Sequence, residues 1–319
     1  MTCNQDNQAV CKVCNKTFQT DRQLHSHVKV HSLRIVEYYQ KHYPRHDIYN
    51  KEIIKFKTKE QYFSTDFNSR TNLRLWLKDK GEDEVIEYCK NLLLKRREKK
   101  KLTYSPSQVE LRTILSPPIQ HLEKIFKGYY KQCEDLGFKN KYQFPTEIVV
   151  GEEHESPLYS IWVDTREQLP LKFNDSLTEI KTLPVGDYAL NEPSLTCNCY
   201  IERKSLADFV STLSVRNLER FEKEIIRAKE IEAKLIILIE DSLENAVKFN
   251  YLPYISKKIQ ATPEYIFHNV RELIQKYQHI QFLFVKGRKE AERVVKKIFF
   301  SKCSYERIDL QLAYDIGVL

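Results

Sequence analysis

Short apolar strands alternate with longer amphipathic helices from about Tyr159 to residue 302. Runs of apolar and β-branched residues predict strands, and these are 160–164, 180–183, 187–190, 199–204, 234–240 and 280–285. Apolar residues at helical spacing predict helices, and these are 205–214, 218–232, 263–277 and 289–302. This alternation is typical of an α/β domain, so we expect a mixed sheet of about five strands with helices on both faces.

The pattern before residue 150 is different. Residues 33–103 predict basic helical segments, and 119–133 predicts one more helix before a polar connection that ends near residue 157. The apolar positions of 83–94 have helical spacing and lead into a basic run. The run contains Lys95, Arg96, Arg97, Lys99, Lys100 and Lys101. Such a run is either a phosphate contact, a nuclear import signal or a solvated helix end, and these three interpretations stay open.

Charge is distributed unevenly along the 319 residues. Residues 1–150 contain 28 Lys and Arg against 18 Asp and Glu, a net charge of +10, whereas the remainder carries −2 of the total of +8. A basic first part and a nearly neutral second part indicate that the first part binds a polyanion. The alternative is a lysine-rich surface that serves only solubility.

Composition excludes several classes of protein. The longest aliphatic run, 235–239, is far shorter than the roughly 20 residues of a membrane span, and no dinucleotide or P-loop glycine motif occurs. The N-terminus has no secretory pattern, so we expect an intracellular reducing compartment, the nucleus if the source is eukaryotic or the host cell if it is viral. The eight cysteines are therefore not expected to form a disulfide framework.

Four metal-ligand residues have a specific spacing near the N-terminus. They are Cys11, Cys14, His27 and His31. Two thiolates on a turn and two imidazoles one helical turn apart can hold Zn²⁺ tetrahedrally. Phe18 and Leu24 supply the few large apolar residues that so small a unit needs. The segment 8–33 resembles a ββα two-Cys, two-His zinc finger.

By that resemblance, four residues of the finger would face DNA: Thr20, Arg22, Gln23 and Ser26. One finger covers only about 3 bp, so it cannot specify a genomic site. Contact with nucleic acid and a structural or protein-contact role are both open for the finger. Cys197 and Cys199 lack the spacing of a second zinc site and are interpreted as ordinary strand and turn residues.

A set of charged residues lies in the predicted sheet. Asp187 and Glu202 are expected on adjacent strands of one hairpin, and side-chain alternation places Lys204 on the face of Glu202 and Arg203 on the opposite face. Asp164 ends a neighbouring strand. Carboxylates are the ligands that Mg²⁺ prefers, and a lysine beside them can hold a water for attack on a phosphodiester.

The motifs VDTRE, GDY and ERK, with Asp208 four residues after Lys204, resemble the nuclease domain of the XPF family over about residues 159–300. The resemblance implies the restriction-endonuclease-like PD-(D/E)XK fold, Mg²⁺ or Mn²⁺ as cofactor, and cleavage of branched or flap-containing DNA. It implies Asp164, Asp187 and Glu202 as catalytic metal ligands and Lys204 as the residue that assists the attacking water. Supporting positions are implied at Glu167, Arg203, Asp208, Arg216 and Arg220.

Each supporting residue also has a structural interpretation. Asp208 fits a helix capping box with Ser205, and both arginines could pair with glutamates on the helix surface. The chain also departs from the family, because only about 16 residues follow the last predicted helix, too few for the helix-hairpin-helix pair that usually dimerises and grips DNA. A homodimer and a heterodimer through the nuclease domain are both left open.

We therefore expect a zinc finger at 8–33, a basic and mainly helical DNA-binding or connector region at 34–150, an XPF-type nuclease domain at 157–305 and a C-terminal tail at 306–319. The expected function is Mg²⁺-dependent hydrolysis of structured DNA in repair, recombination or replication, with DNA as partner and Zn²⁺ in the finger. The alternative is a catalytically inactive DNA-binding scaffold or regulator of the same fold. No contact with a membrane is expected.

Overall fold

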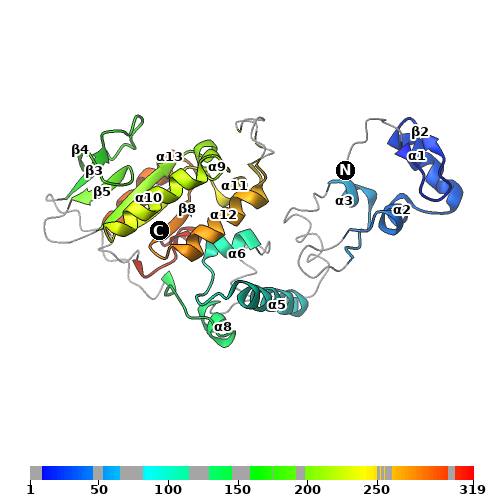
Figure 1. Ribbon diagram of the computed structural model, residues 1–319, viewed down its shortest axis with the longest axis horizontal. Coiled ribbons are helices and arrows are strands. Elements are labelled where there is room, and N and C mark those ends of the chain that lie inside the picture. The colour runs from blue at the N-terminus through cyan, green and yellow to red at the C-terminus, as the bar shows by residue number, and fades with distance from the viewer. Residues whose placement is uncertain are drawn as a thin grey trace. The chain divides into compact units, whose positions relative to one another are not determined.

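The computed structural model describes residues 9–45, 53–64, 82–114, 129–145, 159–174, 176–191, 198–249, 252, 255, 261–300 and 306–319. The chain divides into two units, Met1–Leu92 and Leu93–Leu319, each held together by its own contacts (Figure 1). Within the described ranges, no helix is both long enough and apolar enough to cross a bilayer.

The N-terminal unit begins with a ββα arrangement. Strand β1 (Ala9–Val10) pairs antiparallel with β2 (Thr17–Phe18), and helix α1 (Asp21–Val28) follows. The Thr20 side chain caps α1 by accepting a hydrogen bond from the backbone N–H of Gln23. The 3₁₀ turn η1 (Lys29–His31) completes the segment, which has the fold expected for the zinc finger.

Two further helices continue this unit: α2 (Ile35–His42) and α3 (Lys59–Ser64). Leu24 and Val28 of α1 share one apolar cluster with residues of α2 and the segment beyond it. Those residues are Val36, Tyr38, Tyr39, Ile54, Phe56 and Tyr62. A finger alone has very little core, so these aromatic side chains enlarge the apolar interior on which α1 packs.

Among the described residues, three more helices follow α3 before the sheet begins: α5 (Glu82–Lys100), α6 (Gln108–Ile114) and α8 (Tyr129–Asp135). The boundary between the two units falls inside α5. Helix α6 packs against helices α12 (Pro263–Lys276) and α14 (Leu310–Asp315) of the C-terminal unit. Most of the helix expected at 119–133 lies outside the described residues.

The C-terminal unit is built on one six-stranded sheet, with the order β4-β3-β5-β6-β7-β8. The strands are β3 (Ser160–Asp164), β4 (Leu177–Lys181), β5 (Tyr188–Asn191), β6 (Cys199–Lys204), β7 (Lys234–Ile239) and β8 (Ile280–Phe284). The pairs of β5 with β3 and with β6 are antiparallel, and the other pairs are parallel. The expected mixed α/β sheet is confirmed, with six strands where about five were predicted.

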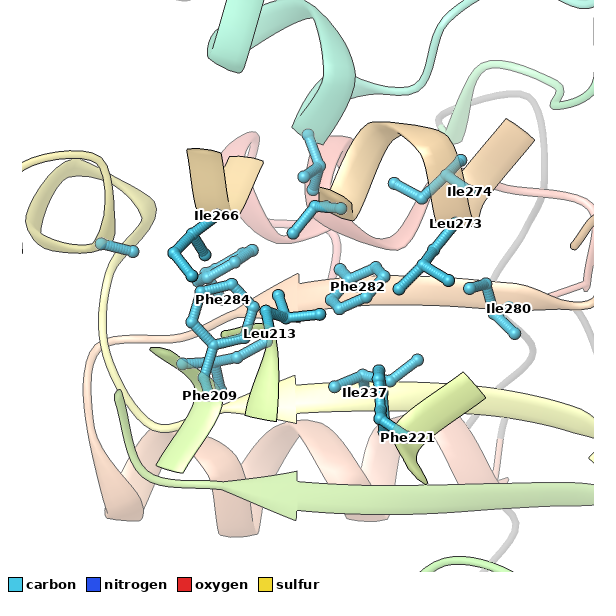
Figure 2. Close-up of a cluster of buried hydrophobic side chains, with 14 of the residues drawn as sticks. Phe209, Leu213, Phe221, Ile237, Ile266, Leu273, Ile274, Ile280, Phe282 and Phe284 are labelled. Atoms are coloured by element: carbon cyan, nitrogen blue, oxygen red, sulfur yellow. The ribbon is translucent and has the colours of Figure 1, made fainter. Parts of the chain in front are cut away.

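Helices cover both faces of the sheet, each over its own apolar cluster. Helices α9 (Leu206–Thr212), α10 (Leu218–Glu230) and α12 pack on the face that carries Ile237 and Phe282 (Figure 2). Helices α13 (Arg288–Phe300) and α14 pack on the face that carries Ile236 and Leu283. Neighbouring residues of β7 and β8 therefore serve opposite cores, as expected for strands buried on both faces.

Two short helices have no counterpart in the hydrophobic pattern: α11 (Leu243–Ala246) and α14. Helix α14 lies in the segment 306–319, which we expected to be a tail, yet its Leu310, Gln311, Leu312 and Ala313 are buried. Such short segments hold too few turns for a helical period to be recognised. The domain bounds 34–150 and 157–305 stay predictions, while the unit around the sheet begins at Leu93.

Candidate functional site

The candidate residues of the nuclease motif gather where β3 and β6 end and β5 begins. Because β3 and β6 both run antiparallel to β5, these ends meet at the same edge of the sheet. Gly186, just before β5, has a φ of +68°, and a Cβ there would come within 3.0 Å of the Ile201 carbonyl oxygen. A glycine is therefore required where the chain turns to bring Asp187 beside β6.

Asp187 lies just before β5, beside the end of β6. The paired register of the two strands includes Tyr188 with Ile201, and the backbone N–H of Asp187 donates to the Ile201 carbonyl at 2.8 Å. Asp187 Oδ2 accepts a hydrogen bond of 2.7 Å from the backbone N–H of Arg203. Lys204 Nζ lies 2.8 Å from Glu202 Oε1, and both side chains are largely buried. Two carboxylates and one ammonium thus come together at this edge.

The ionised form of Asp187 is disfavoured by its surroundings. Burial, followed by the negative charge of Glu202, raises its pKa to about 7. Among the ion pairs of the described residues, none includes Asp187. A cation bound between Asp187 and Glu202 would remove this unfavourable repulsion, so the oxygen donors present fit a hard divalent ion.

Asp164 is buried at the end of β3, but both of its oxygens have partners. Oδ1 lies 2.6 Å from Nε of Arg166, and Oδ2 accepts a 2.7 Å hydrogen bond from the backbone N–H of Leu183. Burial opposes ionisation, yet the hydrogen bonds from Arg166 and Leu183 lower the pKa of Asp164. Binding of a metal by Asp164 would require Arg166 to release it.

Arg203 points to the other side of β6, where it joins an ionic network. Its guanidinium lies 2.9 Å from Glu167 Oε1 and 3.1 Å from Glu240 Oε2. Arg288 contacts Glu240 at 3.4 Å and donates hydrogen bonds to the carbonyls of Leu169 and Pro170. The network connects the loop after β3 to β6, β7 and α13, and it engages Glu167, one of the supporting positions that the family resemblance implied.

The supporting residues after β6 divide into two kinds. Asp208 forms the capping arrangement with Ser205, whose Oγ accepts from the Asp208 N–H at 3.1 Å and donates to Oδ2 at 2.6 Å. Arg216 and Arg220 are exposed. Of the glutamates that could pair with them, Glu219 pairs with Lys223 and Glu222 with Lys276, whereas the charge of Arg220 acts on Glu224 and opposes the rise in its pKa.

Two residues at this edge, Arg166 and Glu240, were not singled out from the sequence, and Glu224 was considered only as a surface partner of the arginines. Burial and the nearby charge of Glu202 raise the pKa of Glu224, which places this α10 residue in the same electrostatic environment. Glu240 follows β7, and only the pairing of β7 with β6 brings it to Arg203. Nothing in the linear spacing points to Glu240. Arg166 belongs to the VDTRE motif that the sequence shows, but its ion pair with Asp164 could not be predicted from the sequence.

The four zinc-ligand candidates converge in the N-terminal unit. Their donor atoms all lie within 4.8 Å of one another, and this is the only such group of Cys, His, Asp or Glu found in the described part of the chain. Cys11 Sγ is 3.5 Å from His31 Nε2, and Cys14 Sγ is 3.2 Å from His27 Nε2. A tetrahedral zinc site has ligand separations of about 3.3–3.8 Å, so the cluster could hold Zn²⁺.

The local electrostatics also suit a metal. Burial opposes ionisation of the Cys11 thiol, but hydrogen bonds from the backbone of Val13 and Cys14 outweigh it and lower the thiol's pKa. Desolvation and the neighbouring His31 lower the pKa of His27. Thiolate and neutral imidazole are the forms that bind zinc. The carboxylates Asp164, Asp187 and Glu202 are not assembled into a comparable set, and their role as ligands stays a prediction.

The proposed DNA-facing residues of the finger are all exposed, yet three of them hydrogen bond within the finger. Thr20 caps the helix, Gln23 Oε1 accepts from the Gln19 N–H at 3.0 Å, and Ser26 Oγ donates to the Arg22 carbonyl at 3.1 Å. Arg22 has the longest reach of the four. A phosphate contact by Arg22 therefore fits the structure better than base reading by all four residues.

The residues of the basic run at the end of α5 fall into two groups, exposed residues and residues that contact the rest of the C-terminal unit. Lys95, Lys99 and Lys101 are exposed. Lys100 pairs with Glu272 at 2.6 Å, and the Arg97 guanidinium lies 5.7 Å from the centre of the Phe138 ring. Arg96 is only partly exposed. The run is thus partly a packing element of the C-terminal unit and partly a free cationic surface.

Part of the chain is similar to known proteins. A family model described as the ERCC4 domain matches residues 163–298. Among solved structures, the chain is similar to "XPF from Aeropyrum pernix, complex with DNA", with 19% identity and a TM-score of 0.35. The similarity covers 46% of this chain and 65% of the Aeropyrum pernix chain, so it spans less than two thirds of that protein's length. No curated protein matches the sequence. Residues 163–298, which include the carboxylates described above, match the model of the ERCC4 domain.

Proposed function

We propose that this protein is a metal-dependent DNA endonuclease that cuts branched, flap or otherwise structured DNA. One observation carries the proposal: within the segment that matches the ERCC4 domain, Asp187 is buried close enough to Glu202 and Lys204 for both charges to affect its pKa, and it has no ion-pair partner of its own among the described residues. In repair, recombination or replication such a site would remove DNA branches. Arg216, between α9 and α10, and Arg220, near the start of α10, are both exposed and could contact the DNA backbone.

Asp187 and Glu202 would hold the divalent ion, for which Mg²⁺ and Mn²⁺ are the proposed candidates. When bound, the ion would offset negative charge on the phosphoryl oxygens and favour ionisation of a water. Lys204 Nζ, anchored by Glu202, would orient the attacking water and stabilise negative charge as it develops. The buried Arg203 would keep β6 and the loop after β3 in register through Glu167 and Glu240.

The test is a cleavage assay with end-labelled duplex, flap, splayed-arm and single-stranded DNA in Mg²⁺ or Mn²⁺. We expect wild-type protein to cut at least one branched substrate and Asp187→Asn and Glu202→Gln to lose detectable cleavage. Lys204→Met should lose about 100-fold or more in rate, because it removes an interaction that acts on the transition state. DNA affinity should change little in the three variants.

Asp135→Asn is the matched control, since Asp135 is an exposed carboxylate on α8 away from the sheet edge. It should cut like wild type. Zinc content and thermal unfolding establish that each variant is folded. If folded wild-type protein cuts none of these substrates in either metal, the proposal is wrong and the DNA-binding scaffold of the same fold replaces it.

A further inference from the structure

A second polar site lies in the C-terminal unit, in a cavity of about 360 Å³ whose wall includes the end of α5 and the segments around Tyr104 and Lys141. The two segments run side by side, because Tyr104 and Lys139 form a parallel bridge and the Ser105 N–H donates to the Lys139 carbonyl at 2.8 Å. Gln275 and Gln278 also line the cavity. None of these residues belongs to the carboxylate site at the sheet edge.

Lys141 lines this cavity, and its ammonium group is unusual. Nζ is buried and has no hydrogen-bond partner within the described residues. Nζ lies 5.0 Å from the centre of the Tyr142 ring. Burial lowers the pKa of Lys141 to about 8, against the opposing charges of Glu110 and Asp309. A buried ammonium with three unused donors is costly unless an anion accepts from it.

The nearby carboxylates do not satisfy Lys141, because their oxygens have other donors. Glu110 Oε2 accepts from the backbone N–H and the hydroxyl of Ser107, and Glu110 Oε1 accepts from Gln275. Asp309 accepts from the backbone N–H groups of Gln108 and Leu312. None of the ion pairs between described residues joins Lys141 to either carboxylate.

Ser105 adds a second unused donor to the same cavity. Its hydroxyl is buried and has no partner in the described part of the chain. Lys100 and Lys101 also line the cavity; Lys100 pairs with Glu272, and Lys101 is exposed. The lining therefore includes one lysine and one serine whose polar groups are buried without a partner among the described residues, together with the exposed Lys101.

We propose that this cavity binds a phosphomonoester, supplied either by the terminal phosphate of a DNA strand or by a free nucleotide. A phosphomonoester carries nearly two negative charges and three strong acceptor oxygens, enough to satisfy Lys141 and Ser105 together and still interact with Lys101. The cavity volume lies at the lower end of the roughly 300–1,000 Å³ of small-ligand sites, which suits an end group better than an internal stretch of duplex.

This proposal does not depend on cleavage by the Asp187 site. It predicts that the protein distinguishes DNA ends that differ only in one phosphate. Fluorescence anisotropy with zinc-loaded full-length protein and a single-stranded oligonucleotide, bearing either a 5′-phosphate or a 5′-hydroxyl, measures this preference. We expect the phosphorylated strand to bind about tenfold more tightly, the size of one or two charge-assisted hydrogen bonds.

Lys141→Met and Ser105→Ala are the test variants, and Lys248→Gln is the matched control because Lys248 is exposed and outside the cavity. Lys141→Met should abolish the preference, Ser105→Ala should reduce it, and Lys248→Gln should keep it. Asp187→Asn should also keep it, which separates this proposal from the proposed nuclease function. Adenosine monophosphate added as a competitor tells whether a free nucleotide occupies the same site.

Thermal unfolding gives an independent readout. At constant ionic strength, inorganic phosphate should raise the Tm of wild type and of Lys248→Gln but not that of Lys141→Met. Without phosphate, Lys141→Met should melt higher than wild type, because it removes an unpaired buried charge. Equal binding of the two oligonucleotides by wild type, or an equal phosphate shift in wild type and Lys141→Met, would overturn the proposal.

Discussion

At the scale of single residues, burial changes the chemistry of carboxylates that look alike in the sequence. Asp164 keeps a lowered pKa because Arg166 and the Leu183 N–H bind its oxygens, whereas the pKa of Asp187 rises to about 7 through burial and the charge of Glu202. Asp309, the N-cap of α14, is buried away from the nuclease motif, and burial raises its pKa to about 6.

Asp309 should make the C-terminal unit more stable in mild acid. Its folded pKa lies above its unfolded value, so its contribution to stability is complete below about pH 4 and is lost as the pH rises through 6. Between pH 5 and pH 8 wild type should lose about 1 kcal/mol of unfolding free energy through this residue. Asp309→Asn should lack that pH dependence.

Urea unfolding of wild type and Asp309→Asn at several pH values measures the difference. Asp135→Asn, at an exposed carboxylate, should follow the wild-type pH dependence and serves as the control. A constant difference in unfolding free energy between wild type and Asp309→Asn from pH 5 to pH 8 would contradict the assignment.

At the scale of elements, the segment with the four zinc-ligand candidates and helix α2 are connected by a shared apolar cluster and a hydrogen bond. Val36, Tyr38 and Tyr39 of α2 pack in the same cluster as Leu24 and Val28 of the finger helix. Tyr38 Oη also accepts a 2.8 Å hydrogen bond from the Lys12 N–H, in the loop that holds the cysteines. The metal cluster and the second helix should therefore form and unfold together.

Removal of zinc should unfold α2 as well as the finger. A structural zinc site supplies about 10–16 kcal/mol of binding free energy, which so small a core cannot replace. Elemental analysis should find one zinc per chain, and Cys14→Ser or a chelator should abolish it together with amide-exchange protection in Ile35–His42. Arg22→Gln, exposed on the same finger helix, should keep both zinc and protection. Protection of α2 that survives zinc loss would refute the coupling.

At the scale of the whole molecule, the basic first part and the nuclease-type domain are not two separable halves. Val109 of α6 belongs to the apolar cluster of the sheet, and Arg112 pairs with Asp315 at 2.7 Å. Truncation near residue 150 would remove core residues of the C-terminal unit. The expectation that residues 1–150 hold most of the DNA affinity is therefore better tested by changing exposed charges than by truncation.

Neutralising exposed lysines on α5 should weaken DNA binding more than neutralising lysines beyond residue 150. The Lys95→Gln, Lys99→Gln double variant should bind less tightly at low salt, with a salt slope flattened by about 0.9 for each DNA phosphate that the protein no longer neutralises. The control is Lys248→Gln with Lys289→Gln, also both exposed. Affinity titrations at several salt concentrations give the slopes, and equal reductions in affinity in the two double variants would exclude a special role for α5.

The sequence by itself determined features that depend on local spacing. Strands buried on both faces must be short apolar runs, so the pattern located β3, β6, β7 and β8 nearly to the residue. The ligand spacing of Cys11, Cys14, His27 and His31 predicted the metal cluster, because a turn and one helical period already bring four donors together. Alternation along β6 predicted that Glu202 and Lys204 share a face, and they do.

Tertiary structure alone decided which partners those residues have. Glu240 reaches Arg203 only through the parallel pairing of β7 with β6, and Asp164 is neutralised by Arg166 and a backbone N–H from the Leu183 segment. Lys141 became a buried, unpaired cation because distant segments packed around it. Spacing encodes contacts within a turn, a hairpin or a helix. Charge pairing, burial and pKa depend on residues tens to hundreds of positions apart, and only the packed fold brings those together.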